Sequence, residues 1–531
     1  MAKYKVFASD GFSREGIEIL EKSGLFDVTV NAKTAREDLL KNIGAYDALI
    51  IRSASRADRE VVTMGKQLKL VARAGVGLDN VDVPAATEKG IVVMNAPSGN
   101  TMSTAELTFA MLLAMSRNIP QAYMSMRQKQ WEKKKFEGIE VHGKTLGIVG
   151  LGRIGREVAK RAIAFGMKVL AYDPYFPQDK AKTLGVEMSD LTRIYKESDF
   201  ITVHTPLSAE TENLITKKEI ALMKPTVRLI NCARGGIINE QDLKDALAAK
   251  RIAAAALDVY ISEPPKEFAY ADLENCITTP HLGASTEEAQ ISVAIETANA
   301  IVSYFRDNVP YNSVNFPTVE AHVLKEISAF VDLASKMGSL LAQISKSSVN
   351  KVEVTYSGTL TEKPTKMVTI SALKGLLSNI IGSEGGVNFV NAPVIAKERG
   401  IAVVERNLTK QSDFTEIVAV KVFTDDGKET EVWGTVFSDG NPRIVRFNQY
   451  HMEIKPDGCA LFIVYRDRPG FVGKVGTIMG EKNININEMR LVRGDDNRAL
   501  MVMALDCAPT AEVYHQVQTI KDIYEIYPIK F

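Results

Sequence analysis

The chain has 531 residues, more than a single hydrophobic core accommodates, so we expect three or four domains. Its 65 Lys and Arg residues balance 65 Asp and Glu residues, and this zero net charge argues against a nucleic-acid-binding protein with a broad basic surface. Four widely spaced cysteines without metal-ligand spacing, and no apolar run long enough for a signal peptide or a membrane span, predict a reduced, metal-free protein of the cytoplasm that does not bind membranes.

The first hundred residues alternate short apolar segments with amphipathic ones. The apolar segments are YKVFASD, YDALIIRS, LKLVARAG and GIVVMNAP, and the stretches between them include REGIEILEKSG and REDLLKNIG. This alternation of strands and helices is typical of a parallel sheet covered by helices. We predict a first α/β domain at 1–98.

A second, longer series follows the amphipathic stretch TMSTAELTFAMLLAMSRN, which begins at Thr101. Its expected strands are TLGIVGLG, MKVLAYDP, DFITVHTP, VRLINCARGG, AAALDVY and CITTPHLGAS. They predict a second doubly wound parallel sheet, in a domain at 99–285. Because ligands of such sheets bind outside the carboxyl ends of the strands, polar residues at these ends are candidates for the site.

The composition changes after the second series. Residues 317–452 combine helices with Thr- and Val-rich segments such as KVEVTYSG, which predicts an intervening α+β domain. Residues 458–531 follow the order strand, helix, strand, strand, helix, strand, which predicts a ferredoxin-like fold.

A glycine-rich turn, GLGRIG, lies between the strand TLGIV and the helix REVAKRAIAFG. Gly150, Gly152 and Gly155 permit a tight turn, and they let backbone N–H groups approach a pyrophosphate at the start of the helix. Asp173 ends the next strand, where a carboxylate can hold the ribose hydroxyls of NAD. Because this carboxylate repels a 2′-phosphate, the sequence favours NAD over NADP.

Three further strand ends present Arg234, Glu263 and His281. Oxidation of an alcohol by hydride transfer needs a base for the hydroxyl proton, and a histidine oriented by a carboxylate provides one. An arginine can bind a substrate carboxylate through two hydrogen bonds. Each residue taken alone has a simpler interpretation: Arg234 as a surface arginine on a tight turn, Glu263 as a solvated turn residue, and His281 as a structural histidine. Their occurrence together after a dinucleotide motif favours an active site.

Several motifs, LGIVGLGRIGREVA, FITVHTPL, INCARGGIIN, ALDVYISEPP and PHLGAS, resemble those of the D-isomer-specific 2-hydroxyacid dehydrogenases. The resemblance implies that Arg234, Glu263 and His281 form the catalytic set, with the histidine as acid and base. It also implies that NAD is the cofactor, that residues 99–285 bind it, and that residues 1–98, completed by a helix within 286–316, bind the substrate. The implied cofactor contacts, beside the three motif glycines and Arg234, are Val76, Arg153, Ile154, Asp173, Thr205, Cys232, Ala233, Asp258, His281, Leu282, Gly283 and Ala284.

With its two additional domains, the chain resembles the long members of that family, which end in an ACT domain. This resemblance implies oxidation of D-3-phosphoglycerate to 3-phosphohydroxypyruvate, the first step of the phosphorylated route to L-serine. Two alternatives remain open. One is another D-2-hydroxyacid dehydrogenase of the glyoxylate or hydroxypyruvate reductase type, and the other is a non-enzymatic protein that senses NAD and binds a partner.

The substrate phosphate requires cations, and Arg52 and Arg73 lie at strand ends of the first sheet. A third candidate, Lys133 in WEKKKF, resembles a segment that family members lend across a dimer interface. On the sequence alone, a solvated charged loop is an equal interpretation of this lysine. We expect a homo-oligomer, either a dimer or a tetramer.

In the last domain, YRDRPGFVGKVGTIMGEKNININ resembles the effector-binding segment of ACT domains. Asp467 and Asn485 stand at the matching positions, which implies a small amino-acid effector. Members that bind serine usually carry a histidine just before DRPG, and this chain has none there. We therefore expect L-serine to act weakly or not at all.

Overall fold

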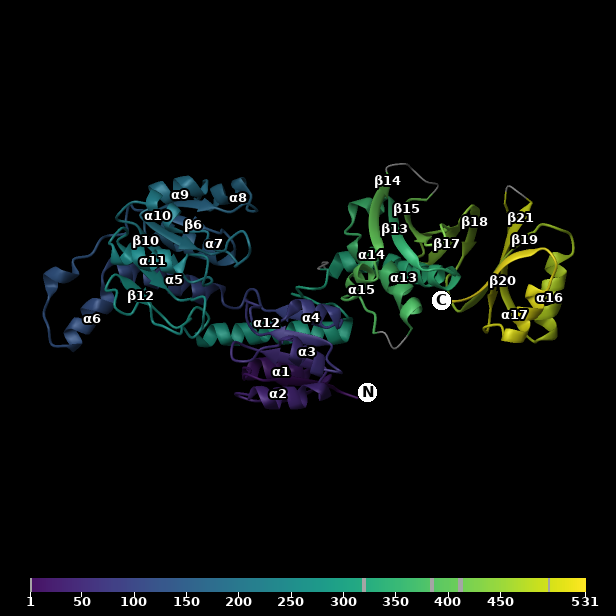
Figure 1. The fold of residues 1–531 in the computed structure, drawn as a ribbon, viewed down its shortest axis with the longest axis horizontal. Coiled ribbons are helices and arrows are strands. Elements are labelled where there is room, and N and C mark those ends of the chain that lie inside the picture. The colour runs from purple at the N-terminus through teal and green to yellow at the C-terminus, as the bar shows by residue number, and fades with distance from the viewer. Residues whose placement is uncertain (1, 318–320, 383–385, 409–413, 495–496) are drawn as a thin grey trace.

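In the computed structural model, the chain forms four β-sheets that follow one another along the sequence (Figure 1). The structure describes residues 2–317, 321–382, 386–408, 414–494 and 497–531. Two sheets are parallel, the third is mixed and the fourth is antiparallel, so the predicted fold class is confirmed. Within these described ranges, every helix is too short or too polar to span a lipid bilayer.

The first sheet has five parallel strands in the order β2-β1-β3-β4-β5. The strands are β1 (Tyr4–Ala8), β2 (Phe26–Val30), β3 (Ala48–Ile51), β4 (Leu70–Arg73) and β5 (Val92–Asn95). The helices are α1 (Arg14–Lys22), α2 (Arg36–Asn42), α3 (Arg59–Met64), α4 (Val83–Glu88) and α12 (Glu287–Asp307), with a short turn η1 (Ile43–Ala45). Ile50 and Leu49 point into separate apolar clusters, so both faces of the sheet are covered.

Helix α12 returns from the second sheet to complete the first, as the sequence predicts. It begins after Thr286, whose hydroxyl accepts a hydrogen bond of 3.2 Å from the Ala289 N–H. It ends at Asn308, which adopts a left-handed conformation with φ of 57°. Its buried face, which includes Ile301, joins one core cluster of the first sheet.

The second sheet has seven parallel strands in the order β12-β11-β10-β9-β6-β7-β8. The strands are β6 (Thr145–Val149), β7 (Lys168–Tyr172), β8 (Glu187–Met188), β9 (Phe200–Val203), β10 (Arg228–Asn231), β11 (Ala254–Leu257) and β12 (Cys276–Thr278). The helices are α5 (Thr101–Ser116), α6 (Ile119–Arg127), α7 (Arg153–Ala164), α8 (Gln178–Thr183), α9 (Leu191–Glu197), α10 (Lys217–Leu222) and α11 (Glu240–Ala248), with a turn η2 (Lys133–Phe136). The strand order reverses at β6, which places a ligand crevice at its carboxyl end.

The third sheet has the order β14-β13-β15-β16-β17-β18. The strands are β13 (Val349–Gly358), β14 (Ala402–Leu408), β15 (Glu416–Thr424), β16 (Glu429–Val436), β17 (Pro442–Phe447) and β18 (Tyr450–Ile454). The helices are α13 (Ala321–Ile344), α14 (Lys366–Ile381) and α15 (Ala392–Glu398), with a turn η3 (Thr359–Glu362). Only the β13–β14 pair is parallel among the strand pairs of this sheet that the structure describes.

The fourth sheet is antiparallel, with the order β20-β21-β19-β22. Its elements are β19 (Cys459–Arg466), α16 (Phe471–Glu481), β20 (Ile486–Arg493), β21 (Arg498–Leu505), α17 (Ala511–Gln518) and β22 (Ile523–Lys530). Both helices pack on one face of the sheet around Leu461. The opposite face, with Phe462, belongs to the core cluster of the third sheet, and the ring centroids of Phe462 and Phe447 lie 5.6 Å apart.

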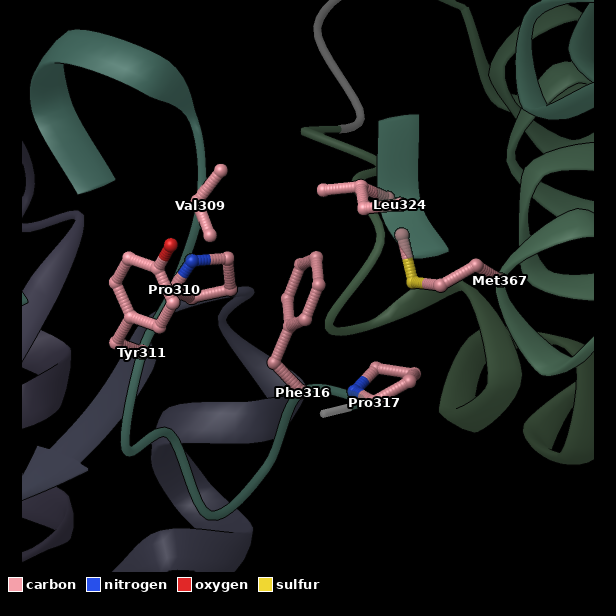
Figure 2. Close-up of a pocket in the computed structure, with 7 residues that line it drawn as sticks. All are labelled: Val309, Pro310, Tyr311, Phe316, Pro317, Leu324 and Met367. Carbon is pink, nitrogen blue, oxygen red and sulfur yellow. The ribbon is translucent and has the colours of Figure 1, made fainter. Parts of the chain in front are cut away.

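The first and third sheets meet through a small set of side chains. Figure 2 shows Val309, Pro310, Tyr311, Phe316 and Pro317, from the segment after α12, facing Leu324 of α13 and Met367 of α14 across an apolar cavity. Nearby, the Asn388 amide donates a hydrogen bond of 2.8 Å to the Gly90 carbonyl. Val390 is buried in a core cluster of the first sheet. The third sheet is therefore anchored at the start of β5.

Candidate active site

The turn after β10 is shaped by Asn231 before it presents Arg234. The buried Asn231 side chain accepts from the Ala233 N–H at 3.0 Å and donates to the Arg234 carbonyl at 2.8 Å. Gly235 in this turn leaves no room for a side chain, because a Cβ there would collide with the backbone of Tyr260. The turn consequently holds the backbone of Arg234 at the carboxyl end of the strand.

The guanidinium of Arg234 crosses from the second sheet to the turn after β4. Its Nε lies 3.2 Å from Oδ2 of Asp79, and its Nη1 donates to the Ala233 carbonyl at 2.7 Å. Its Nη2 lies against Gly77, where a Cβ would displace it. The arginine therefore faces the space between the two parallel sheets, where an anion can reach it.

Glu263 and His281 form a direct pair, with 2.5 Å between Oε2 of Glu263 and Nδ1 of His281. The other carboxylate oxygen of Glu263 accepts from the Tyr260 N–H at 3.1 Å. Burial raises the pKa of Glu263, but the hydrogen bonds from His281 and Tyr260 and the charges of His281 and Arg234 together hold that pKa below its usual value. The carboxylate therefore stays ionised beside the imidazole at neutral pH.

The loop that carries His281 is organised by Asp258, whose side chain is fully buried. Its carboxylate accepts from the N–H groups of Leu282 and Gly283, at 2.7 and 2.9 Å, and from the Thr279 hydroxyl at 2.6 Å. The His281 N–H donates to the Asp258 carbonyl at 2.9 Å, and His281 itself adopts a left-handed conformation with φ of 54°. The predicted contact residue Asp258 thus fixes the HLGA loop through its side chain.

The glycine-rich turn has the geometry that its motif predicts. Gly150 has a φ of 97°, and a Cβ there would lie 2.6 Å from the His204 carbonyl oxygen. A Cβ at Gly155 would collide with the Gly150 carbonyl, so helix α7 can approach the turn only with glycine at that position. The Asp173 carboxylate accepts from the N–H groups of Leu151 and Tyr175, at 2.8 and 2.9 Å. It therefore ties the end of β7 to the turn.

These residues fit a bound dinucleotide. Gly152 is the amino-terminal cap of α7, and a Cβ there would meet no atom within 4 Å, so space is open beside the helix start. Buried polar atoms without a partner, Oγ1 of Thr205 and Nδ1 of His204, lie on the strand end next to Gly150. Arg153 and Ile154 open α7, and the Arg153 side chain donates to the Pro97 carbonyl at 3.0 Å.

The remaining predicted cofactor contacts lie around the same crevice. The Val76 carbonyl accepts from the Asn95 amide at 2.7 Å. The Ala284 carbonyl accepts from the Gln290 amide at 2.6 Å. Cys232 is buried, with its Sγ 3.5 Å from Sδ of Met111, and burial raises the pKa of its thiol to about 12. Its thiol is therefore a packing group, and any contact with a ligand comes from its backbone.

Arg52 and Arg73 lie at neighbouring strand ends of the first sheet. The Arg52 side chain donates to Oε1 of Gln290 on α12, and Nη2 of Arg73 donates to the Ser53 hydroxyl at 3.2 Å. Burial, reinforced by the nearby charge of Arg234, lowers the pKa of Arg73 to about 10. The structure thus brings these two arginines to the same cleft as Arg234.

Lys133 lies elsewhere in this single chain. It opens the turn η2 after α6, and α6 projects from the second sheet away from the first (Figure 1). The neighbouring Lys135 lies 3.7 Å from Glu274, which precedes β12, and the Gln121 amide donates to the Glu274 carbonyl at 2.7 Å. The segment therefore lies toward the amino ends of the strands, whereas the candidate site lies at their carboxyl ends.

Asp467 and Asn485 are not together within one chain. Asp467 forms an ion pair with Arg493 at 2.6 Å, and Arg493 ends β20. Asn485 directly precedes the other end of β20, and its amide donates to Asn487 at 2.9 Å. The eight residues of β20 separate the two predicted effector contacts.

Sequence reasoning missed the side chains that shape the cleft. Asn80 donates to the carbonyls of Arg52 and Ser55, both at 2.6 Å, and so joins the turn after β4 to the loop after β3. The RAGVGLDNVD stretch signals a turn, but no sequence pattern shows that Asp79 reaches Arg234. His204, which directly follows β9, is not one of these side chains. Burial lowers its pKa to about 4, and its Nε2 lies 3.0 Å from the Thr202 hydroxyl, as expected of a structural histidine.

Comparison with known proteins agrees with this geometry. The NAD-binding domain model of the D-isomer specific 2-hydroxyacid dehydrogenases matches residues 109–283, and the D-3-phosphoglycerate dehydrogenase intervening domain model matches residues 326–448. The solved D-lactate dehydrogenase from Aquifex aeolicus, complexed with NAD and lactic acid, covers 59% of this chain and 100% of its own, with 26% identity and a TM-score of 0.53. The fold and the strand-end site define a D-isomer-specific 2-hydroxyacid dehydrogenase.

The similarity to curated proteins extends over the other two sheets. The chain is 41% identical to D-3-phosphoglycerate dehydrogenase from Methanocaldococcus jannaschii over 98% of this chain and 99% of that protein, and 38% identical to the Bacillus subtilis enzyme over the same shares. The chain belongs to the D-3-phosphoglycerate dehydrogenase family. Among the described residues, no cluster of His, Cys, Asp or Glu side chains could hold a metal ion.

Proposed function

We propose that the protein oxidises D-3-phosphoglycerate to 3-phosphohydroxypyruvate with NAD, the first step of the phosphorylated route to L-serine. The observation that carries the proposal is the Glu263–His281 pair, which lies at adjacent strand ends with Arg234, in the same sheet as the dinucleotide turn. The family relationship over nearly the whole chain supports it.

His281 takes the hydroxyl proton in this proposal. Because its Nδ1 is held by the Glu263 carboxylate, Nε2 is the nitrogen left to face the substrate. The carboxylate fixes the imidazole orientation and stabilises the imidazolium that forms as the proton arrives. NAD, when bound, supplies the hydride acceptor. The N–H groups at the start of α7, the Asp173 carboxylate and the Thr205 hydroxyl would hold it.

Different arginines bind the two charged ends of the substrate. Arg234 binds the carboxylate next to the reacting carbon, and Arg52 and Arg73 bind the phosphate. The buried position of Arg73 supports this role, because its guanidinium Nε has no protein partner and burial penalises its charge. An anion bound in the cleft would give Nε of Arg73 a hydrogen-bond partner and would balance the charge of its guanidinium.

The proposal divides the chain into four units. Residues 1–98 and 286–316 bind the substrate, residues 99–285 bind NAD, residues 317–452 form the intervening domain, and residues 458–531 form the ACT domain. The course of α12 from one parallel sheet to the other supports the second boundary. Four free cysteines support the reducing cytoplasm as the working compartment.

We also propose that the protein is a homo-oligomer. Tyr123, Met124 and Met126 on α6 are more than half exposed, and Trp131 after it is 80% exposed. An apolar surface of this kind on a projecting segment favours burial against a second copy. In such a dimer, Lys133 would be carried toward the partner subunit, where it could reach the substrate phosphate.

An amino-acid effector at the fourth sheet likewise requires two copies. Since β20 is an edge strand, two copies can pair along it around a twofold axis. Antiparallel pairing of the two β20 edges would set Asp467 of one copy beside Asn485 of the other, which one chain cannot achieve. The Asp467–Arg493 ion pair would have to open for the carboxylate to receive an ammonium.

NADH formation with a panel of D-2-hydroxy acids tests the function. We expect D-3-phosphoglycerate to give the highest kcat/KM, with L-serine inhibiting weakly or not at all. A preference for glycerate, glycolate or lactate would identify another D-2-hydroxyacid dehydrogenase. Tight NAD binding without turnover of any substrate in the panel would identify an NAD-sensing binding protein. Solution mass, measured with and without L-serine, tests the oligomer and the effector.

A further inference from the structure

Asp79 is an acidic side chain that meets the substrate-binding arginines directly. It lies in the turn after β4, on the opposite side of the cleft from Arg234, and its Oδ2 is 3.2 Å from Nε of Arg234. The only other carboxylate near Arg52 among the described contacts, Asp10, is occupied by the N–H groups of Arg52 and Ser55 and by the Ser55 hydroxyl. Glu263 also feels the charge of Arg234, but its carboxylate is held by His281 and the Tyr260 N–H. Asp79 is therefore the acid in direct contact with the guanidinium of Arg234.

The backbone around Asp79 is anchored although its side chain is 69% exposed. Asn80 donates to the Arg52 and Ser55 carbonyls, and Asn95 donates to the Val76 carbonyl, so the turn is fixed on both sides. Gly77 in the same turn leaves the space that Nη2 of Arg234 occupies. The turn thus offers a shaped seat for one guanidinium from the other sheet.

Electrostatics explains why this seat needs a carboxylate. Arg73 is buried near Arg234, and the positive charge of Arg234 disfavours the charged form of Arg73, whereas Asp79 favours it. Without Asp79, two like charges would face each other and Arg234 would be free to turn away. Asp79 holds Nε and the Ala233 carbonyl holds Nη1, so the guanidinium is fixed in one orientation beside the turn after β4.

We infer that Asp79 is a positioning residue for the substrate carboxylate, acting through Arg234 across the cleft between the two parallel sheets. This inference rests on the proposed function, because it assigns the substrate carboxylate to Arg234. Asp79 touches the arginine and not the reacting atoms, so it governs substrate affinity more than the chemical step.

The test is steady-state kinetics of Asp79→Asn, which keeps the side-chain shape and removes its charge. We expect KM for D-3-phosphoglycerate to rise about fivefold, near the upper limit for a partly exposed ion pair, while kcat and KM for NAD change little. Asp79→Glu should restore part of the loss. Asp522→Asn is the matched control, because it removes a similar ion pair with Arg468, 3.1 Å long, in the fourth sheet.

A double-mutant cycle with Arg234→Lys separates positioning from a general effect on the fold. If Asp79 acts through Arg234, then Asp79→Asn adds little to the loss already caused by Arg234→Lys. An unchanged KM in Asp79→Asn would overturn the inference, and a lower KM would show instead that Asp79 competes with the substrate. Full additivity, or a loss of kcat together with a lower Tm, would also overturn it. Failure of the proposed function is distinguishable, because the unaltered protein would then form no NADH from D-3-phosphoglycerate.

Discussion

The two parallel sheets and the two C-terminal sheets are joined in opposite ways. The parallel sheets keep separate hydrophobic cores, and the contacts between them that surround the site are polar, including Arg234 with Asp79 and Arg153 with the Pro97 carbonyl. The third and fourth sheets instead share one apolar cluster, which contains both Phe447 and Phe462.

This difference has physical consequences. A cleft lined by polar groups admits an ionic substrate, and it allows the sheets to move relative to each other at small cost in buried apolar area. An apolar interface resists separation, because its exposure to water costs about 25 cal/mol per Å². The C-terminal half should consequently respond to an effector or a mutation as one body, whereas the N-terminal half should respond at individual side chains.

The largest effect is expected from Phe462→Ala at the shared core. Removal of a fully buried phenylalanine costs about 3–5 kcal/mol, and here the cost should fall on both C-terminal sheets. The fluorescence of Trp433, in β16, follows the unfolding of the third sheet. The measurement uses a Trp131→Phe background, so that Trp433 is the remaining tryptophan. We expect its unfolding midpoint in urea to fall sharply, with kcat under native conditions largely retained.

The matched control for Phe462→Ala is Leu461→Ala. Leu461 is equally buried and adjacent on β19, but its side chain faces the helices of the fourth sheet. It should shift the Trp433 transition less than Phe462→Ala does. No shift of the Trp433 transition with Phe462→Ala would mean that the fourth sheet unfolds without reference to the third. A larger shift with Leu461→Ala than with Phe462→Ala would mean that the shared cluster is not what couples the two sheets.

The next effect is expected at a single side chain of the N-terminal half. His281→Ala should lower kcat by about 100-fold or more, because general acid and base catalysis contributes at least this factor. NAD affinity, read by titration, should hold, since the imidazole faces the substrate proton. His142→Ala is the control, because His142 is exposed and packs beside Gly166. Near-normal kcat in the His281 variant would show that His281 is not the acid and base of the reaction.

A smaller effect is expected from Asp173→Ala, which bears on cofactor choice. The variant loses a hydrogen-bonding carboxylate worth about 1.5–3 kcal/mol to its partners, so kcat/KM for NAD should fall at least tenfold. The ratio of kcat/KM for NADP to that for NAD should rise, because no charge then repels a 2′-phosphate. The exposed Asp179 of α8 offers a control substitution. An unchanged ratio would show that Asp173 does not select the cofactor and serves only to hold the N–H groups of Leu151 and Tyr175.

The same contrast explains which features the sequence could predict. The positions of strands and of their ends follow from local periodicity, so the two parallel sheets, the glycine turn and the Glu263–His281 pair could be expected before the structure. The Arg234–Asp79 contact joins residues that are far apart in the chain, and no local pattern encodes it. The shared core is similar, because the continuous apolar run of β19 marks both of its faces as buried without showing what covers Phe462.

The predicted effector contacts, Asp467 and Asn485, show what the sequence of one chain could not predict. Both residues occupy positions expected of an ACT domain, but within one chain the strand β20 keeps them apart. The segment of Lys133 lies toward the amino ends of the strands, away from the candidate site. In the homo-oligomer proposed above, a second copy would bring both sets together, and the periodicity of one chain carries no information about contacts between copies.

The smallest effect, and the sharpest on mechanism, is expected from Glu263→Gln. The pKa of the Glu263 carboxyl is held below its usual value, so the carboxylate is charged throughout the neutral range and loses its charge only as pH falls through that lowered pKa. A neutral amide can still contact Nδ1 of His281, but it supplies no counter-charge for the imidazolium that forms as the hydroxyl proton arrives. The value of kcat for oxidation should therefore fall at neutral pH, by less than in the substitutions above. The difference in kcat between the two proteins should narrow as pH falls through the lowered pKa of Glu263, because residue 263 then has a neutral side chain in both. Glu240→Gln is a suitable control, since Glu240 accepts from the nearby Ile261 N–H at 2.7 Å without contacting His281. A kcat equal to that of the unaltered protein at neutral pH would show that Glu263 holds the imidazole by geometry and not by charge.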